Sequence, residues 1–176
     1  MRIISGSLKS RRINPPSGLP TRPTTDRAKE GLFNILQHRI DFESITFLDL
    51  FAGTGNITFE VASRGCKQVT CVDNNSKCVD FIRQTAKAFH LEGIHTFRTN
   101  VFSFLSQKQN SWDIIFADPP YDLENLESLP DLVFTNQLLR PEGLLIIEHS
   151  PKITFRQHPR IRDHRIYGLV NFSLFA

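Results

Sequence analysis

Short apolar runs alternate with longer amphipathic stretches over most of the chain. The runs at residues 45–50, 69–72, 95–99, 112–117 and 144–148 have the length and composition of strands. Between them, apolar residues recur at helical spacing in residues 57–64, 76–89, 102–105 and 126–139. Strands that alternate with helices predict an α/β fold with a doubly wound, mainly parallel sheet. Residues 162–167 and 169–175 meet at Gly168 and predict a final hairpin that brings the sheet to seven strands.

The first 40 residues have a different pattern. Residues 1–4 and 11–13 are strand-like and flank a Ser-Gly-Ser turn, which predicts a β-hairpin. Four prolines then indicate an extended connector, and the Thr-Thr-Asp sequence at residues 24–26 predicts the start of a helix with Ala28 and Leu32 on its apolar face. We expect residues 1–40 to be an appendage to a single domain formed by residues 41–176.

The strand at residues 112–117 leads into Asp118-Pro119-Pro120-Tyr121. Two prolines end the strand at the carboxyl edge of the sheet, where open α/β sheets bind their ligands. They also hold Asp118 extended, so that a carboxylate, a backbone carbonyl and an aromatic ring are presented together. A carboxylate and a carbonyl accept the two N–H bonds of a planar amine, and the ring of Tyr121 stacks on a flipped base. These four residues are the predicted catalytic residues, and the alternative is a plain turn with Tyr121 packed on the prolines.

A second motif follows the strand at residues 45–50. Asp49 precedes Gly53-Thr54-Gly55, where glycines allow a tight turn and a close approach of the backbone to a ligand. Gly-x-Gly alone is weak evidence, but the next strand ends in Asp73, about twenty residues on, where a carboxylate accepts both hydroxyls of a ribose. A dinucleotide site follows the same logic, yet Thr58 stands where that pattern has its third glycine.

Composition limits the class of protein. The chain has 176 residues, of which 40% are hydrophobic and 22% charged, as in one globular domain. No apolar run is long enough to cross a bilayer, and no signal peptide begins the chain, so we expect a cytoplasmic protein without membrane contact. The three cysteines lack Cys-x-x-Cys spacing and the six histidines do not cluster, so we expect no metal site. His149 is the one histidine close to the predicted cleft.

Basic residues gather near both ends of the chain. Residues 1–40 hold eight Lys or Arg against two acidic residues, and residues 152–165 hold five against one, although the net charge is only +3. This segregation is typical of a polyanion-binding surface beside a small-molecule pocket. Solvated surface charge is the alternative.

The motifs Asp49-Leu50-Phe51-Ala52-Gly53-Thr54-Gly55 and Asp118-Pro119-Pro120-Tyr121, with Arg22-Pro23-Thr24-Thr25-Asp26-Arg27 upstream, together resemble the RsmD family. These are bacterial methyltransferases that modify the N2 amine of a guanine in 16S ribosomal RNA. The likeness covers nearly the whole chain, and the Arg-Pro-Thr segment after a basic hairpin is its most specific part. It implies a Rossmann-like class I fold, methylation of a guanine N2 amine and ribosomal RNA or a small-subunit particle as the partner.

The resemblance also implies S-adenosylmethionine as the cofactor and S-adenosylhomocysteine as the product. The implied cofactor-binding residues are Asp49, Phe51, Ala52, Gly53, Thr54, Gly55, Asp73, Asn74, Asn100, Val101 and Asp118. The expected RNA-binding residues are Lys9, Arg11, Arg12, Arg22, Thr24 and Arg27. We expect a chain of this size to act as a monomer.

Other functions stay open. A DNA adenine or cytosine amino-methyltransferase shares both chemical motifs but normally needs an additional target-recognition region, for which this chain has little room. A protein-glutamine methyltransferase typically carries Asn where Asp118 stands. A non-enzymatic RNA-binding module explains the basic ends but leaves the carboxylates without a use. Glu148 is equally compatible with a buried polar residue satisfied by the backbone.

Overall fold

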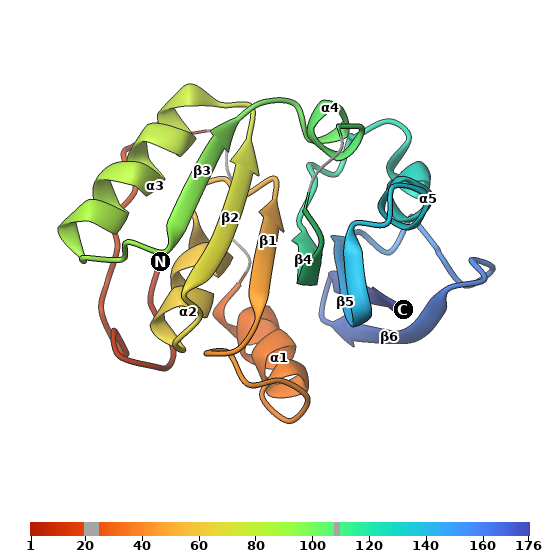
Figure 1. The fold of residues 1–176 in the computed structure, drawn as a ribbon, viewed down its shortest axis with the longest axis horizontal. Helices are drawn as coiled ribbons and strands as arrows, with labels where there is room; N and C mark the ends of the chain where they lie inside the picture. The colour runs from red at the N-terminus through yellow and green to blue at the C-terminus, as the bar shows by residue number, and fades with distance from the viewer. Residues whose placement is uncertain (20–24, 108–109) are drawn as a thin grey trace.

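The computed structural model describes residues 1–19, 25–107 and 110–176. Its centre is a seven-stranded sheet in the order β3-β2-β1-β4-β5-β7-β6 (Figure 1). The five parallel strands are β1 (Thr46–Leu50), β2 (Gln68–Asp73), β3 (Ile94–Arg98), β4 (Trp112–Ala117) and β5 (Leu139–His149). The antiparallel hairpin is formed by β6 (Ile161–Tyr167) and β7 (Val170–Phe175). The predicted fold class is therefore confirmed.

Helices cover both faces of this sheet, because its strands carry apolar side chains on both faces. Phe47 packs in the cluster that contains residues of two helices, whereas the adjacent Leu48 packs with helices of the opposite face. On the first side lie α1 (Asp26–Leu36), α2 (Asn56–Ser63) and α3 (Ser76–Ala88). On the second lie α4 (Val101–Leu105), the 3-10 turn η1 (Leu126–Ser128) and α5 (Leu129–Thr135). In the described ranges, no helix has both the length and the hydrophobicity to cross a membrane.

One predicted boundary is wrong. The helix expected over residues 126–139 ends at Thr135, and β5 begins at Leu139 instead of residue 144. The chain reverses at Gln137, whose φ is +53°, and Leu139 pairs with Trp112 ahead of an irregularity in the β4–β5 register. Leu138 is buried, so its apolar side chain extended the helical pattern in the sequence although it belongs to the turn.

The predicted N-terminal hairpin is present and lies against α2. Arg2 and Arg12 form an antiparallel bridge, and the turn between them packs on Ser63 at the last turn of α2. A Cβ on Gly6 would lie 1.8 Å from the backbone oxygen of Ser63, so only glycine fits there. In Figure 1 this turn lies at the end of the molecule opposite the arrowheads of β1 to β3. The connector is described only as far as residue 19, so its later prolines lie outside the described residues.

A buried ion pair joins the hairpin, α1 and α2. Lys29 Nζ lies 3.5 Å from Glu60 Oε2, and the two side chains are 1% and 0% exposed. Lys29 also donates to the Arg2 carbonyl at 2.6 Å, and Glu60 accepts from the backbone N–H of Ile4 at 2.7 Å. Buried charges are stable only when they are paired and hydrogen-bonded. The described parts of residues 1–40 are thus packed onto the sheet domain, and their separate role as an appendage stays a prediction.

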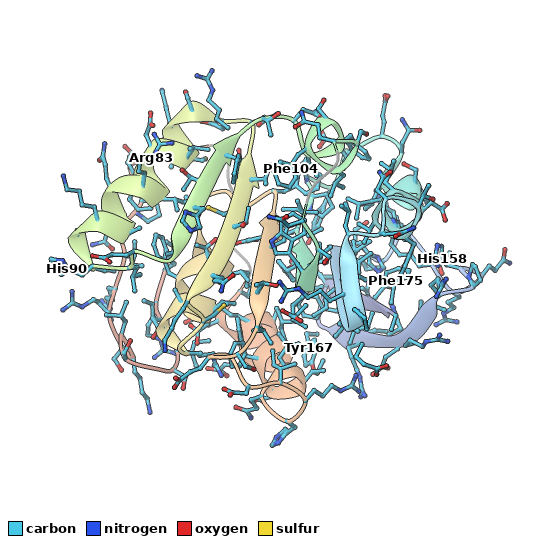
Figure 2. The ribbon with its side chains drawn as sticks, in the orientation of Figure 1. Arg83, His90, Phe104, His158, Tyr167 and Phe175 are labelled. Atoms are coloured by element: carbon cyan, nitrogen blue, oxygen red, sulfur yellow. The ribbon has the colours of Figure 1, made fainter. Side chains whose placement is uncertain are left out.

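The C-terminal hairpin closes against the same helix layer. A Cβ on Gly31 would lie 2.4 Å from the Tyr167 ring, so the ring of β6 rests directly on the backbone of α1. Figure 2 shows Tyr167 close to α1 at the lower edge of the sheet. This contact places the start of β7 beside the carboxyl end of β5, where His149 pairs with Asn171.

Candidate active site

A cavity of about 430 Å³ opens at the carboxyl ends of the parallel strands. Its lining comes from the residues that follow β1, β2, β3 and β4, from the end of β5 and from the first turn of α2. The strand order reverses between β1 and β4, and ligands of open α/β sheets bind at such a reversal. The cavity is therefore where the topology alone would place a ligand.

Most of the residues predicted from the sequence line this cavity. From the expected cofactor set they are Asp49, Phe51, Ala52, Gly53, Thr54, Asp73, Asn74, Asn100, Val101 and Asp118. The expected catalytic residues Pro119, Pro120 and Tyr121 line it as well. Gly55 does not, and its importance is conformational: it precedes α2 at a φ of +77°, and a Cβ there would lie 2.8 Å from the ring of Phe59.

The loop after β1 is wound tightly. Phe51, Gly53 and Gly55 all have positive φ angles, of 58°, 53° and 77°. Such an angle is uncommon for a bulky residue such as Phe51, and backbone strain of this kind clusters at ligand-binding sites. The backbone N–H of Ala52 is tied to the Val72 carbonyl at 3.1 Å. The loop is thus anchored to the end of β2.

Asp73 fixes the adjoining edge of the cavity. Its Oδ2 accepts a hydrogen bond from the N–H of Gly53 at 2.8 Å, and its Oδ1 accepts one from the N–H of Asn75 at 2.8 Å. Each carboxylate oxygen has two acceptor positions, so the group retains capacity for further donors. Asp73 therefore presents an oriented acceptor next to the glycine loop, as a ribose site requires.

Asp49 is the most buried of the acidic residues that line the cavity. It is 2% exposed, and its Oδ2 accepts hydrogen bonds from the hydroxyl of Thr58 and, at 3.0 Å, from the Thr58 N–H. Burial raises the pKa of the Asp49 carboxyl to about 7; the Thr58 bonds oppose this shift, and the carboxylates of Asp118 and Asp73 add to it. The three carboxylates thus share one site, and such a site attracts a cation.

The tip of β4 closes the other side of the cavity. The N–H of Asp118 donates to the Leu50 carbonyl at 3.3 Å, which holds the tip against the end of β1. The N–H of Leu123 donates to the Pro120 carbonyl at 3.0 Å and forms the turn expected from the two prolines. Tyr121 is 44% exposed, so part of its side chain is open to solvent. Asp118 and the glycine loop therefore border the same space.

Several lining residues were missed from the sequence. Thr25 is the N-cap of α1, Glu148 ends an apolar strand, and Val170 comes from the terminal hairpin. The sequence did carry a signal that Glu148 lines a site, because a charged residue closes an apolar run there. Val170 gave no signal, because its place depends on how β7 pairs with β5.

Of the predicted RNA-binding residues, Lys9, Arg11, Arg12 and Arg27 are exposed, but they do not all lie near the cavity. The hairpin turn contacts the last turn of α2, whereas the cavity touches its first turn, and eight residues of helix separate them by about 12 Å. Arg11 lies over the Phe89 ring, with 4.8 Å from Cζ to the ring centroid. Arg27 is exposed two residues after the cavity-lining Thr25. The predicted Arg22 and Thr24 lie outside the described residues.

His149 belongs to the core and lies outside the cavity lining. Its two ring nitrogens lie 2.9 Å from the Ser150 carbonyl and 2.8 Å from the Ser173 hydroxyl, and burial lowers the pKa of its imidazole. The ring packs edge-on against Phe155. In residues 1–19, 25–107 and 110–176, no group of three or more His, Cys, Asp or Glu is placed to hold a metal ion.

The sheet order, the strained glycine loop and the acidic cavity define a class I methyltransferase. The chain belongs to the RsmD family: the family described as Conserved hypothetical protein 95 matches residues 1–176. Ribosomal RNA small subunit methyltransferase D of Escherichia coli (strain K12) is 32% identical over 178 residues, 99% of this chain and 89% of that protein. The Haemophilus influenzae protein of the same name is 30% identical over 182 residues, 99% of this chain and 93% of the relative. The solved structure of Escherichia coli yhhF has a TM-score of 0.86 at 30% identity and covers 99% of this chain and 96% of its own.

Proposed function

We propose that this protein transfers a methyl group from S-adenosylmethionine to the exocyclic N2 amine of a guanine in small-subunit ribosomal RNA. The observation that carries the proposal is that Asp118 and the loop of residues 49–55 border one cavity. The names of the Escherichia coli and Haemophilus influenzae relatives support ribosomal RNA of the small subunit as the substrate.

The residues of the cavity fit the cofactor. Bound S-adenosylmethionine supplies an electrophilic methyl group on a positively charged sulfur. Asp73, already oriented by two backbone N–H groups, accepts the two ribose hydroxyls. Asp49 accepts from a cationic amino group, which also relieves the cost of its buried charge. Among the described residues of the lining there is no Lys or Arg that would repel a cation.

At the other side, Asp118 and the Pro119 carbonyl accept the two N–H bonds of the amine. The amine of a nucleobase is a poor nucleophile because its lone pair is spread into the ring, and holding both N–H bonds directs electron density at the methyl group. Tyr121 stacks on the flipped base. A direct in-line transfer would form the nitrogen–carbon bond as the sulfur–carbon bond breaks, without a covalent bond to the protein, and the proton that the amine loses would pass to the carboxylate of Asp118.

Labelled S-adenosylmethionine, offered with DNA, naked ribosomal RNA and small-subunit particles in turn, tests the substrate class. We expect label only in the small-subunit RNA, in a nucleoside that mass spectrometry identifies as N2-methylguanosine. Label in DNA would favour the DNA amino-methyltransferase, and RNA binding without label would favour the non-enzymatic module.

Asp118→Ala tests the mechanism. We expect a rate at least about a hundredfold lower with nearly unchanged cofactor affinity, because an oriented acceptor typically contributes that much to a transfer. Asp122→Ala, an exposed aspartate four residues on, is the matched control and should keep normal activity. Activity retained in Asp118→Ala, or lost together with cofactor binding, would contradict the assigned role.

A further inference from the structure

Glu148 is a buried carboxylate that the proposed mechanism does not use. Its residue is 3% exposed, and it lines the same cavity as Asp118 and Tyr121. It is the second-to-last residue of β5, at the carboxyl edge of the sheet. A buried carboxylate that borders a cavity is a candidate to accept hydrogen bonds from the ligand, because its two oxygens have about four acceptor positions.

The strand register sets Glu148 beside Asp118. Ala117 of β4 pairs with Ile147 of β5 in parallel, and the residues that follow each of them are Asp118 and Glu148. Neighbouring strands lie about 4.8 Å apart, and residues in register on parallel strands point to the same face. Two residues before Asp118 in β4, Phe116 lines the same cavity. Both carboxylates thus come from the ends of adjacent strands and line the same cavity.

The Watson–Crick edge of guanine matches this pair of groups. Guanine carries its N1–H and its N2 amine side by side, so the edge offers adjacent hydrogen-bond donors. An ionised carboxylate accepts hydrogen bonds and donates none. Adenine and 2-aminopurine have a bare lone pair at N1, which would face a carboxylate with no proton between them. A second acceptor beside Asp118 therefore favours guanine and disfavours a base whose N1 lacks hydrogen.

We propose that Glu148 accepts the N1–H of the target guanine while Asp118 holds its N2 amine, so that Glu148 selects the base. The inference rests on the proposed methylation of guanine and names the residue responsible for its base specificity. A site built around a hydrogen bond rejects an analogue that lacks the donor much more strongly than a hydrophobic pocket does, because a polar group of the site then loses the hydrogen bond for which it is positioned.

The test compares guanine with 2-aminopurine, which keeps the amine at C2 but has no hydrogen on N1. The methylated nucleotide is first mapped by mass spectrometry, and the small-subunit RNA is then ligated with either base at that position. We expect the wild-type protein to prefer guanine by at least about a hundredfold in kcat/KM. In Glu148→Gln the preference should fall at least tenfold, since the amide N–H of glutamine donates to the bare N1.

Controls separate base selection from damage to the fold or the cofactor site. Glu92→Gln changes an exposed glutamate in the same way and should keep the wild-type preference. The affinity of Glu148→Gln for S-adenosylmethionine should stay within about twofold of wild type, as expected for a residue that touches only the base.

Two results would overturn the inference. One is equal methylation of guanine and 2-aminopurine by the wild-type protein, which needs no variant to be observed. The other is an unchanged preference in a folded, cofactor-binding Glu148→Gln. A wild-type protein that methylates neither base would instead refute the proposed function, so the two failures are distinguishable.

Discussion

Lowering the pH from 7 to 5.5 should weaken the binding of S-adenosylmethionine about fifteenfold through Asp49 alone. The pKa of this carboxyl is raised to about 7, chiefly by burial. If the ionised carboxylate holds the cationic amino group of the cofactor, then binding below pH 7 requires that Asp49 release a proton. Each further unit of pH below the pKa therefore weakens binding by nearly tenfold.

The magnitude follows from the ionised fraction of Asp49. With a pKa of about 7 in the cofactor-free protein, about half of the molecules carry an ionised Asp49 at pH 7 and about 3% at pH 5.5. The ratio of these fractions is the expected change in affinity. The sign for stability is opposite: the pKa is higher in the folded state than its ordinary 3.8, so the cofactor-free protein loses stability as the pH rises from about 4 through 7.

Isothermal titration calorimetry at half-unit steps of pH measures the effect. Asp49→Asn cannot ionise, so its affinity should be weaker at pH 7 and show only the pH dependence of the cofactor itself. Thr58→Val removes the hydroxyl that donates to the carboxylate and should move the midpoint of the wild-type curve to higher pH.

Parallel curves for the wild type and Asp49→Asn between pH 5.5 and 7 would refute the reasoning. Such a result would mean that Asp49 is already ionised across this range or does not touch the amino group. An unmoved midpoint in Thr58→Val would show that the hydroxyl does not stabilise the ionised form.

Three further predictions concern the N-terminal segment. Gly6→Ala should destabilise the protein by about 1–3 kcal/mol more than Gly18→Ala in urea unfolding, because the φ angles are alike, +83° and +84°, but only Gly6 has backbone atoms within 4 Å of the added Cβ. Equal losses would show that contact with α2 is unimportant. Lys29→Met should cost about 1–3 kcal/mol, because it removes the ammonium partner of buried Glu60 while Arg64 stays paired with this carboxylate, whereas the exposed Lys87→Met should change stability by less than about 0.5 kcal/mol. Joint replacement of the exposed basic residues by Gln should lower the slope of log affinity for RNA against log salt by about 3, and an unchanged slope would exclude them from the interface. These residues are Lys9, Arg11, Arg12 and Arg27.

The end of β4 and the start of α3 were predictable from the sequence, because particular residues end a strand or cap a helix. Pro119 and Pro120 end β4 after Ala117, and Asn75 caps α3 with bonds to the N–H groups of Lys77 and Cys78. Since the carboxyl ends of parallel strands lie at one edge, the motifs that follow β1, β2, β3 and β4 had to meet. That logic located most of the cavity without coordinates.

What the sequence did not reveal depends on pairings between distant segments. The polar residues Lys29 and Glu60 are 31 positions apart on two helices, and each one alone reads as a solvent-exposed charge. Val170 reaches the cavity only because β7 inserts antiparallel between β5 and β6. The apolar periodicity wrongly placed Leu138 in a helix, because a buried residue in a turn has the same apolar character as a buried residue in a helix.

The division of charge in this molecule resolves a conflict in the proposed reaction. Four acidic residues line the cavity, namely Asp49, Asp73, Asp118 and Glu148, and a polyanionic RNA would be repelled from it. A flipped base, however, is uncharged and brings its donor edge with it, while the phosphates stay outside. We therefore expect exposed basic residues such as Arg27 to contact the phosphates. A charge added at the rim should therefore change the affinity for RNA, with little effect on cofactor binding or base selection. A charge added in the cavity should change cofactor binding and base selection, with little effect on the affinity for RNA.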